Sequence, residues 1–216
     1  MTAAVCVDLD GTLVRYDRSF DAVVAATLTD HLGTATDEIV AAYTDAFIDA
    51  FEALEPRPYH AGMDAALACA GGSPDVDDGA GTDTHSDALV AAYRDREYAA
   101  GTVSEATRNC LADLGADPDT SVAVVTDGVG DWQRGKLAHH GLADLVDATV
   151  VSYEVGGHKT DGDPYEAVRD RLAADEYVMV GDSYAADVEA AREAGFVPVH
   201  YEDEGPDLFA VLKAFL

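Results

Sequence analysis

The sequence predicts an α/β protein with a doubly wound, mostly parallel, Rossmann-like sheet of about five strands and an inserted helical cap domain. Helix-like stretches separate the later apolar runs from one another, and a long helical segment follows the first run. Short apolar runs of the kind that form buried parallel strands recur along the chain, namely Ala3–Val7, Val122–Val125, Ala148–Val151, Tyr177–Val180 and Phe196–Val199.

Helices are predicted between the later strands. The stretches with helical spacing are Gly130–His140, Pro164–Ala173 and Ser183–Ala194. Gly141 and Gly195 stand directly after the first and third of these stretches, where glycine commonly ends a helix. Helices in these positions can return the chain to the start of the next parallel strand, as a doubly wound sheet requires.

The segment after the first strand is predicted to be helical. Its Gly71–Ser86 stretch is rich in Gly, Asp, Ser and Thr, so we expect a mobile loop there. We therefore expect an α/β core of residues 1–15 and 100–216, with residues 16–99 inserted as a helical cap. The stretches with helical composition and spacing are Asp17–Leu32, Thr36–Leu54, Met63–Ala70 and Asp87–Ala99.

The composition is strongly acidic. Among 216 residues, 42 acidic against 13 basic side chains give a net charge of -29 and a pI near 4.1. A nucleic acid is therefore excluded as an expected partner, because its phosphates would be repelled by most of the surface. The acids are spread along the chain, and this composition is similar to that of proteins from extreme halophiles, whose surface charges are screened in concentrated salt. An ordinary acidic protein is the alternative.

Apolar residues make up 48% of the chain, but no apolar run approaches the roughly 20 residues of a membrane span. The first residues lack the basic leader and cleavage site of a signal peptide. Cys6, Cys69 and Cys110 are odd in number and have no paired or metal-type spacing, which favours free thiols in a reducing compartment. We expect a cytoplasmic protein with no membrane partner.

Acidic residues follow the first and fourth predicted strands. Asp8 and Asp10, two residues apart and followed by Gly11, come directly after the first strand. Asp182 comes directly after the strand Tyr177–Val180 and its glycine, and Asp187 follows nearby. In open α/β sheets the reactive crevice lies beyond the carboxyl ends of the strands, so these acids are candidates for catalysis or metal binding. A turn or a helix N-cap is the alternative.

Two further signals fit an anion site at the same edge. Thr126, Asp127 and Gly128 follow the second strand, where a hydroxyl and turn amides can hold a phosphate oxygen. Lys159 lies between glycines and a helix start in a chain that has only three lysines. The alternatives are an ordinary turn and an exposed, solubilising charge.

In this order, the four signals resemble the signature motifs of the haloacid dehalogenase-like superfamily. The resemblance covers residues 3–14 and 101–196, and the segment Gln133–Val155 is similar to the family's segment between its second and third motifs. The helical insertion stands where many members carry a cap over the active site. The chain departs from the family at Thr160 and Gly162, where a Lys-Pro-Asp-Pro run is frequent, and at Asp127, where many members have Asn.

The resemblance implies a covalent mechanism. Asp8 would attack phosphorus and form an aspartyl phosphate. Asp10 would protonate the departing alcohol and then take a proton from the attacking water. Mg²⁺ would be held by Asp8, the backbone carbonyl of Asp10 and Asp182, with Asp187 as a further ligand or as a residue that orients the others.

The resemblance also implies a phosphate-binding set. Thr126 and Lys159 would contact the transferring phosphoryl group, where negative charge is concentrated. Asp127 belongs to the same segment, but an acid beside a phosphate weakens anion binding unless it points away or touches metal, so its role stays open. The expected ligand is a small phosphorylated metabolite.

Several functions share such a core. Hydrolysis of a phosphate monoester leads, a sugar phosphomutase is the enzymatic alternative, and a non-catalytic metabolite-binding protein is the alternative from another class. A dehalogenase is disfavoured because it does not need Asp10, and phosphonate hydrolysis calls for a cap lysine, which is missing between Met1 and Gly135.

The cap arginines Arg57, Arg94 and Arg96 either reach a substrate or are solvated charges. Oligomeric state is left open.

Overall fold

The computed structural model describes residues 1–71 and 85–201, so most of the predicted loop Gly71–Ser86 lies outside the described residues. The chain divides into two compact units, which we call the α/β unit (residues 1–15 and 102–216) and the helical unit (residues 16–101). The short strands β2 (Arg15–Tyr16) and β3 (Gly101–Thr102), which pair with each other, stand at the two chain crossings between the units.

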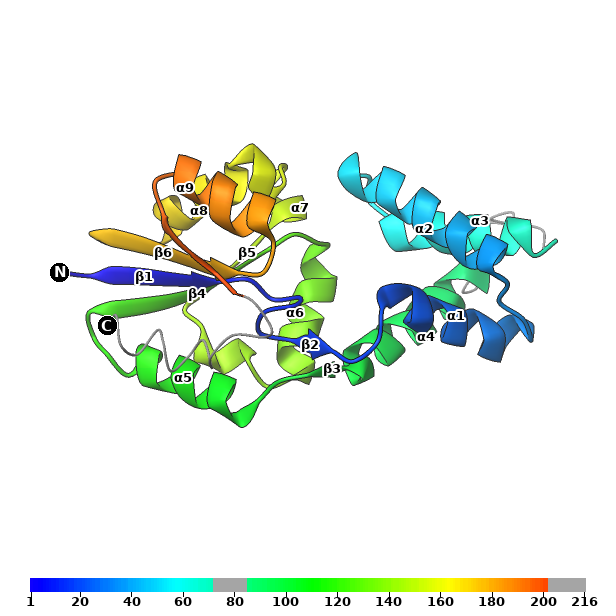
Figure 1. Cartoon of the computed structure of the whole chain (residues 1–216), viewed down its shortest axis with the longest axis horizontal. Coiled ribbons are helices and arrows are strands. Elements are labelled where there is room, and N and C mark those ends of the chain that lie inside the picture. Colours follow the sequence, from blue (N-terminus) through cyan, green and yellow to red (C-terminus); the bar gives the residue numbers. More distant parts are fainter. Residues whose placement is uncertain (72–84, 202–216) are drawn as a thin grey trace, which may run out of the picture. The chain divides into compact units, whose positions relative to one another are not determined.

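The α/β unit is built on a five-stranded sheet of order β5-β4-β1-β6-β7 (Figure 1). Its neighbouring strands are all parallel. The predicted fold class is therefore confirmed. The strands are β1 (Ala3–Val7), β4 (Thr120–Thr126), β5 (Ala148–Val151), β6 (Glu176–Gly181) and β7 (Val197–His200).

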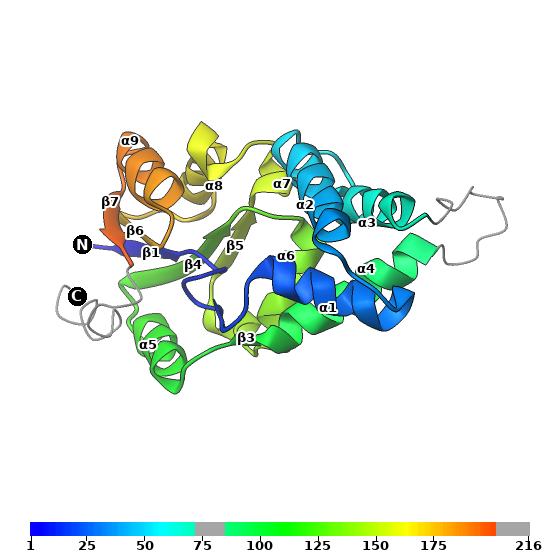
Figure 2. The ribbon, with the colours of Figure 1, turned by 45° about the vertical axis from the view of Figure 1, so that its right-hand side comes forward.

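The central strands are apolar because helices cover both faces of the sheet. Helices α8 and α9 lie on one face and α5 on the other, as both ribbon views show (Figures 1 and 2). Val5, Cys6 and Val7 of β1 are fully buried. The helical segments of this unit are α5 (Glu105–Gly115), α6 (Gly130–His139), η1 (Ala143–Leu145), α7 (Ser152–Val155), η2 (Lys159–Asp161), α8 (Asp163–Arg171), η3 (Tyr184–Ala190) and α9 (Ala191–Glu193).

The segment predicted as one helix, Ser183–Ala194, differs from that expectation. It starts as the π-helical segment η3 and ends as the short helix α9. The Asp187 amide donates to the Ser183 carbonyl over 2.7 Å, while the Asp187 carboxylate accepts from the Ser183 amide over 3.0 Å. This double contact folds the Asp187 side chain back toward the end of β6, where it is fully buried. π-Helical turns are rare and are frequent at functional sites.

The helical unit contains α1 (Phe20–Leu32), α2 (Asp37–Glu52), α3 (Pro58–Cys69) and α4 (His85–Ala100) (Figure 2). Helix α3 begins before the predicted start at Met63, because Pro58 occupies its first position and proline is well suited there. Gly62 of α3 lies against Tyr43 of α2: a Cβ at Gly62 would be 2.7 Å from the Tyr43 ring. None of the described helices is long and apolar enough to cross a membrane.

Candidate active site

The predicted site residues of the sheet lie together at one edge. Asp8 follows β1, Thr126 ends β4 and Asp182 follows β6. Val7 is in register with Val124 and Val180, so the three strands end nearly level with one another. Because all three run in the same direction, their carboxyl ends bring the residues that follow them to a single crevice.

The turn after Asp8 is tight. The Gly11 amide donates to the Val14 carbonyl over 2.9 Å, and the Val14 amide donates to the Leu9 carbonyl over 2.8 Å. Gly11 has a φ of 89°, and a Cβ there would overlap the carboxylate of Asp182. Glycine is therefore required for two reasons, the left-handed backbone and the close approach of an acid.

Lys159 joins two buried carboxylates. Its Nζ lies 2.7 Å from Asp8 Oδ1 and 2.6 Å from Asp187 Oδ1, and all three side chains are buried. Burial raises the pKa of Asp8, and the Lys159 ammonium opposes this rise. Burial also raises the pKa of Asp187, again against the effect of Lys159. For Lys159 burial lowers the pKa, but the surrounding carboxylates more than compensate and the net direction is upward.

A third carboxylate completes an acidic cluster. Oxygens of Asp8, Asp182 and Asp187 lie within 4.8 Å of one another, and Asp182 Oδ1 accepts from the Thr12 hydroxyl over 3.1 Å. The cluster fits a magnesium ion, because all its donors are carboxylate oxygens, which hard divalent cations prefer. Three acids beside the single ammonium of Lys159 also leave negative charge that a divalent cation would neutralise.

The start of η2, which carries Lys159, is held by two acids. Asp127 Oδ1 accepts from the Lys159 amide over 3.0 Å, and Asp161 Oδ2 accepts from the His158 amide over 2.9 Å. Asp127 Oδ1 also lies 3.6 Å from His158 Nδ1. Asp127 thus contacts the segment that carries Lys159.

Asp10 has its own set of donors, from two residues that sequence reasoning missed. Lys136 Nζ lies 2.6 Å from Asp10 Oδ1, and Gln133 Nε2 donates to Asp10 Oδ2 over 2.8 Å. Gln133 also donates to the Thr126 hydroxyl over 2.8 Å. One sequence signal was available: Lys136 is one of only three lysines, and it stands in a predicted helix that directly follows the second motif.

Comparison with known proteins shows the family of this chain. Residues 2–195 match the sequence model of the haloacid dehalogenase-like hydrolases, so the match takes in Asp8, Thr126, Lys159 and Asp182. The chain belongs to this family. A solved member with a similar fold is the HAD-hydrolase YfnB of Bacillus subtilis, described with bound magnesium: 98% of this chain and 99% of that one superpose with a TM-score of 0.70 at 19% identity.

Two characterised relatives of this haloacid dehalogenase-like hydrolase are similar over shorter stretches. The phosphoserine phosphatase of Thermus thermophilus is 39% identical over 77 residues, which are 35% of this chain and 31% of that protein. The pyrimidine 5'-nucleotidase PynA of Streptococcus pneumoniae is 28% identical over 94 residues, 42% of this chain and 40% of that protein. Each alignment spans less than half of the relative's length.

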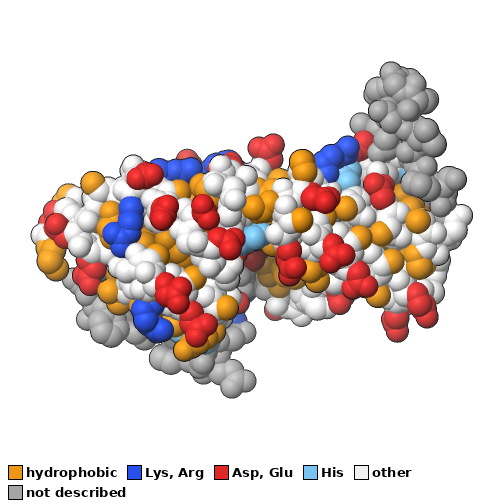
Figure 3. Space-filling view, turned by 90° about the horizontal axis from the view of Figure 1, so that it is seen from above, with side chains coloured by type: hydrophobic (Ala, Val, Ile, Leu, Met, Phe, Trp, Pro, Cys, Tyr) orange, Lys and Arg blue, Asp and Glu red, His pale blue; other side chains and the backbone are white. Residues whose placement is uncertain are grey.

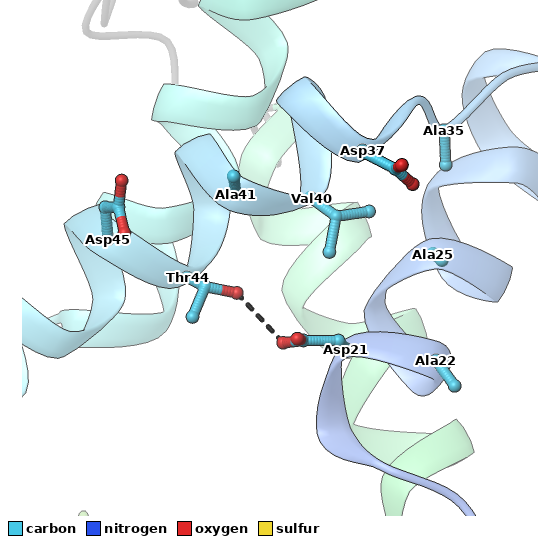
Figure 4. A pocket seen from close by; sticks show the side chains of 9 residues that line it. All are labelled: Asp21, Ala22, Ala25, Ala35, Asp37, Val40, Ala41, Thr44 and Asp45. Atoms are coloured by element: carbon cyan, nitrogen blue, oxygen red, sulfur yellow. Dashed lines mark hydrogen bonds between the residues drawn. The ribbon is translucent and has the colours of Figure 1, made fainter.

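The helical unit of this hydrolase has a groove of its own, of about 450 Å³, between α1 and α2 (Figure 4). The Thr44 hydroxyl donates to Asp21 Oδ1 over 3.1 Å across it, and Asp37 and Asp45 also contribute to its lining. None of the described residues that line the groove is basic. An anionic substrate is therefore disfavoured there, and the candidate phosphate site is the edge of the sheet.

Proposed function

We propose that the chain is a Mg²⁺-dependent phosphatase that hydrolyses a small phosphate monoester through an aspartyl phosphate on Asp8. One observation carries the proposal: the crevice holds two carboxylates, Asp8 and Asp10, with separate sets of donors. Asp8 shares Lys159 with Asp187, whereas Asp10 is bound by Lys136 and Gln133. Different environments for neighbouring carboxyl groups are typical of sites in which one is a nucleophile and the other an acid and base.

The second carboxylate separates this proposal from a dehalogenase. Release of a halide needs no proton, so a dehalogenase gains nothing from a second acid beside the nucleophile. An alkoxide leaving group does need a proton, and a positioned carboxyl group supplies it. The two characterised relatives, a phosphatase and a nucleotidase by name, support the same choice.

The proposed reaction has two steps. A carboxylate oxygen of Asp8 attacks phosphorus, the bond from phosphorus to the ester oxygen breaks with its electron pair on that oxygen, and Asp10 gives it a proton. Water then attacks the aspartyl phosphate, gives a proton to Asp10, and releases phosphate and the Asp8 carboxylate. During both steps Lys159 and the hydroxyl of Thr126 are the donors to the phosphoryl oxygens.

We propose that Asp8, Asp182 and the backbone carbonyl of Asp10 hold Mg²⁺, with Asp187 beside them. When bound, the ion supplies positive charge that reduces the repulsion between an anionic nucleophile and an anionic substrate. Asp187 is fully buried and accepts a hydrogen bond from the Ser183 amide. These contacts hold its carboxylate in place beside the proposed ligands.

We propose that the helical unit acts as a cap that selects the substrate's remote end. Its insertion between β2 and β3 leaves it tethered by two short strands, which suits a unit that opens and closes over a site. The described basic side chains of this unit include Arg57, Arg94 and Arg96, which pair with Asp87, Asp95 and Asp30 respectively. Each of these three arginines therefore already pairs with an aspartate at the surface of the helical unit.

The acidic surface suits a protein that works in concentrated salt. Figure 3 shows acidic side chains spread over the face that it presents, with fewer basic ones among them. A net charge of -29 destabilises a compact chain at low ionic strength, and at about 1 M salt a Debye length of about 3 Å screens most of that repulsion. We therefore propose assays in concentrated KCl.

The experiment is phosphate release from a panel of phosphate esters in concentrated KCl, with and without Mg²⁺. The panel includes phosphoserine, a pyrimidine 5'-nucleotide and sugar phosphates. We expect turnover that requires Mg²⁺ and that falls at least about 10³-fold in Asp8→Asn, because the variant lacks the attacking oxygen. Acid quenching of the wild-type protein should trap phosphate on Asp8.

Other outcomes favour other functions. Transfer of the phosphoryl group to a sugar hydroxyl instead of water would identify a phosphomutase. Binding of Mg²⁺ by the folded protein with no turnover of any ester would contradict the proposal and favour a metabolite-binding protein.

A further inference from the structure

Helix α6 presents two buried polar side chains to the acid of the site. Gln133 and Lys136 are three residues apart and therefore lie on the same face of the helix. Their exposed fractions are 2% and 1%. A lysine is rarely this buried unless it is paired, because removal of an ammonium group from water is costly. Lys136 is paired with the Asp10 carboxylate, at 2.6 Å.

The two side chains bind different oxygens of the same carboxyl group. Lys136 contacts Oδ1 of Asp10 at 2.6 Å and Gln133 contacts Oδ2 at 2.8 Å. One donor would leave the carboxyl group free to rotate about its last bond, whereas donors on both oxygens fix its plane. The Asp10 side chain is still 25% exposed, so part of it stays accessible.

The orientation of the Gln133 amide is set by the site. Its Nε2 faces three acceptors, which are Asp10 Oδ2, the Thr126 hydroxyl at 2.8 Å and the Asp127 carbonyl at 3.1 Å. Its Oε1 is buried and has no hydrogen-bond partner among the described residues. An unpaired buried acceptor such as Oε1 costs free energy. The hydrogen bonds that Nε2 donates offset this cost and so determine the orientation of the amide.

The same amide also orients the phosphate donor. Since the Thr126 oxygen accepts from Gln133, its own hydrogen is directed elsewhere, and the carbonyl of Asp127 is a weak alternative at 3.3 Å. A phosphoryl oxygen in the site would replace this carbonyl as the acceptor. A single glutamine thus links the proton-carrying acid with the hydroxyl that would contact the phosphoryl group.

We propose that Gln133 and Lys136 are positioning residues that hold the Asp10 carboxyl group where it delivers its proton to the leaving oxygen. This inference rests on the proposed phosphatase function. It assigns the site to esters of poor leaving groups, alkyl phosphates above all, because only these depend strongly on a placed acid. A purely structural role for α6 would affect all substrates alike.

The experiment compares leaving groups in single turnovers with excess protein, so that leaving-group release is followed without the later hydrolysis of the aspartyl phosphate. One substrate is the alkyl phosphate that the wild-type protein hydrolyses fastest, and the other is p-nitrophenyl phosphate, whose leaving group departs without a proton. In Lys136→Met we expect release from the alkyl ester to fall by about 10²-fold and release of p-nitrophenol to change little. Gln133→Met should act in the same direction.

The matched control is Arg134→Met. Arg134 lies on the same helix, but its side chain is exposed and pairs with Glu154, so both rates should stay at the wild-type value. Mg²⁺ binding and circular dichroism establish that each variant is folded, and Gln133→Met provides the test if Lys136→Met is not.

The outcomes separate the two proposals. If the wild-type protein releases neither leaving group, the phosphatase proposal fails. If the wild-type protein is active but the variants lose both reactions equally, or lose neither, the positioning role is wrong.

Discussion

The pairs that lysines form in the α/β unit and the pairs that arginines form in the helical unit differ in burial. In the α/β unit, the buried Lys159 pairs with the buried Asp8 and Asp187, and the buried Lys136 pairs with Asp10, whose side chain is 25% exposed. In the helical unit, which contains no lysine, the described pairs that arginines form are exposed, such as Arg57 with Asp87 and Arg96 with Asp30; His60 also lies 2.8 Å from Asp87.

Burial changes what an ion pair costs and what it contributes. A buried pair gains little net stability, because the cost of removing both charges from water offsets their attraction. An exposed pair costs little and also contributes little. A chain with few basic residues nevertheless places two of its three lysines in the costly environment, which fits the roles proposed for Lys159 and Lys136.

The largest effect is expected from removal of the buried cation. Lys159→Met leaves Asp8 and Asp187 buried without their ammonium group, and loss of one partner of a buried pair typically costs about 3 kcal/mol or more. We expect a lower free energy of unfolding without Mg²⁺ and a larger stabilisation by Mg²⁺ than in the wild-type protein, since the ion replaces the missing positive charge. Denaturation followed by the fluorescence of Trp132, the single tryptophan, measures both quantities.

An unchanged midpoint in Mg²⁺-free solution would contradict the view that the α/β unit depends on this pair. A variant that is destabilised but gains no more from Mg²⁺ than the wild-type protein would argue against a metal site at Asp8, Asp182 and Asp187.

A smaller effect is expected in the helical unit, from packing instead of charge. In Gly62→Ala the new methyl group would lie 2.7 Å from the Tyr43 ring and 3.0 Å from the Tyr43 carbonyl oxygen. The carbonyl belongs to the backbone of a helix and cannot move away as easily as a side chain. Overpacking of this kind costs about 1–3 kcal/mol. We expect a lower midpoint by circular dichroism, which reports on the helices, and a smaller change in Trp132 fluorescence.

Gly115→Ala is the matched control in the other unit. A Cβ at Gly115, the last residue of α5, would meet nothing within 4 Å. Stability should stay the same or rise by about 0.4–1 kcal/mol, because alanine restricts the unfolded chain. Equal losses in both variants would mean that the tight contact of α2 with α3 is not the cause.

The sequence was sufficient to predict the sheet and the residues that follow its strands. Apolar runs identify the strands, and parallel strands bring Asp8, Thr126 and Asp182 to one edge whatever the intervening segments do. Helix α5 was missed although its buried residues have helical spacing and Ser104 caps it, with a bond of 2.9 Å from the Thr107 amide. The spacing of these buried residues is the sequence signal for this helix.

Burial of polar groups was harder to predict. Lysine and glutamine on a helix are exposed in most proteins, so residue type alone argued against Gln133 and Lys136 as parts of a site. The π-helical turn at Asp187 likewise depends on contacts with Ser183 that have no periodic signature. These features follow from tertiary contacts, which a local pattern does not contain.

The smallest effect is expected from an exposed pair of the helical unit. Arg57 Nη2 lies 2.6 Å from Asp87 Oδ1, and the Arg57 side chain is 62% exposed. Arg57→Met should lower the free energy of unfolding by less than about 1 kcal/mol, and the loss should shrink in about 1 M KCl, where the Debye length is about 3 Å. The same salt should leave most of the Lys159→Met effect in place, because the buried carboxylates are shielded from ions. Denaturation of both variants at two KCl concentrations measures this contrast. If salt reduces the loss of unfolding free energy equally in both variants, burial does not shield the Lys159 pair as we expect.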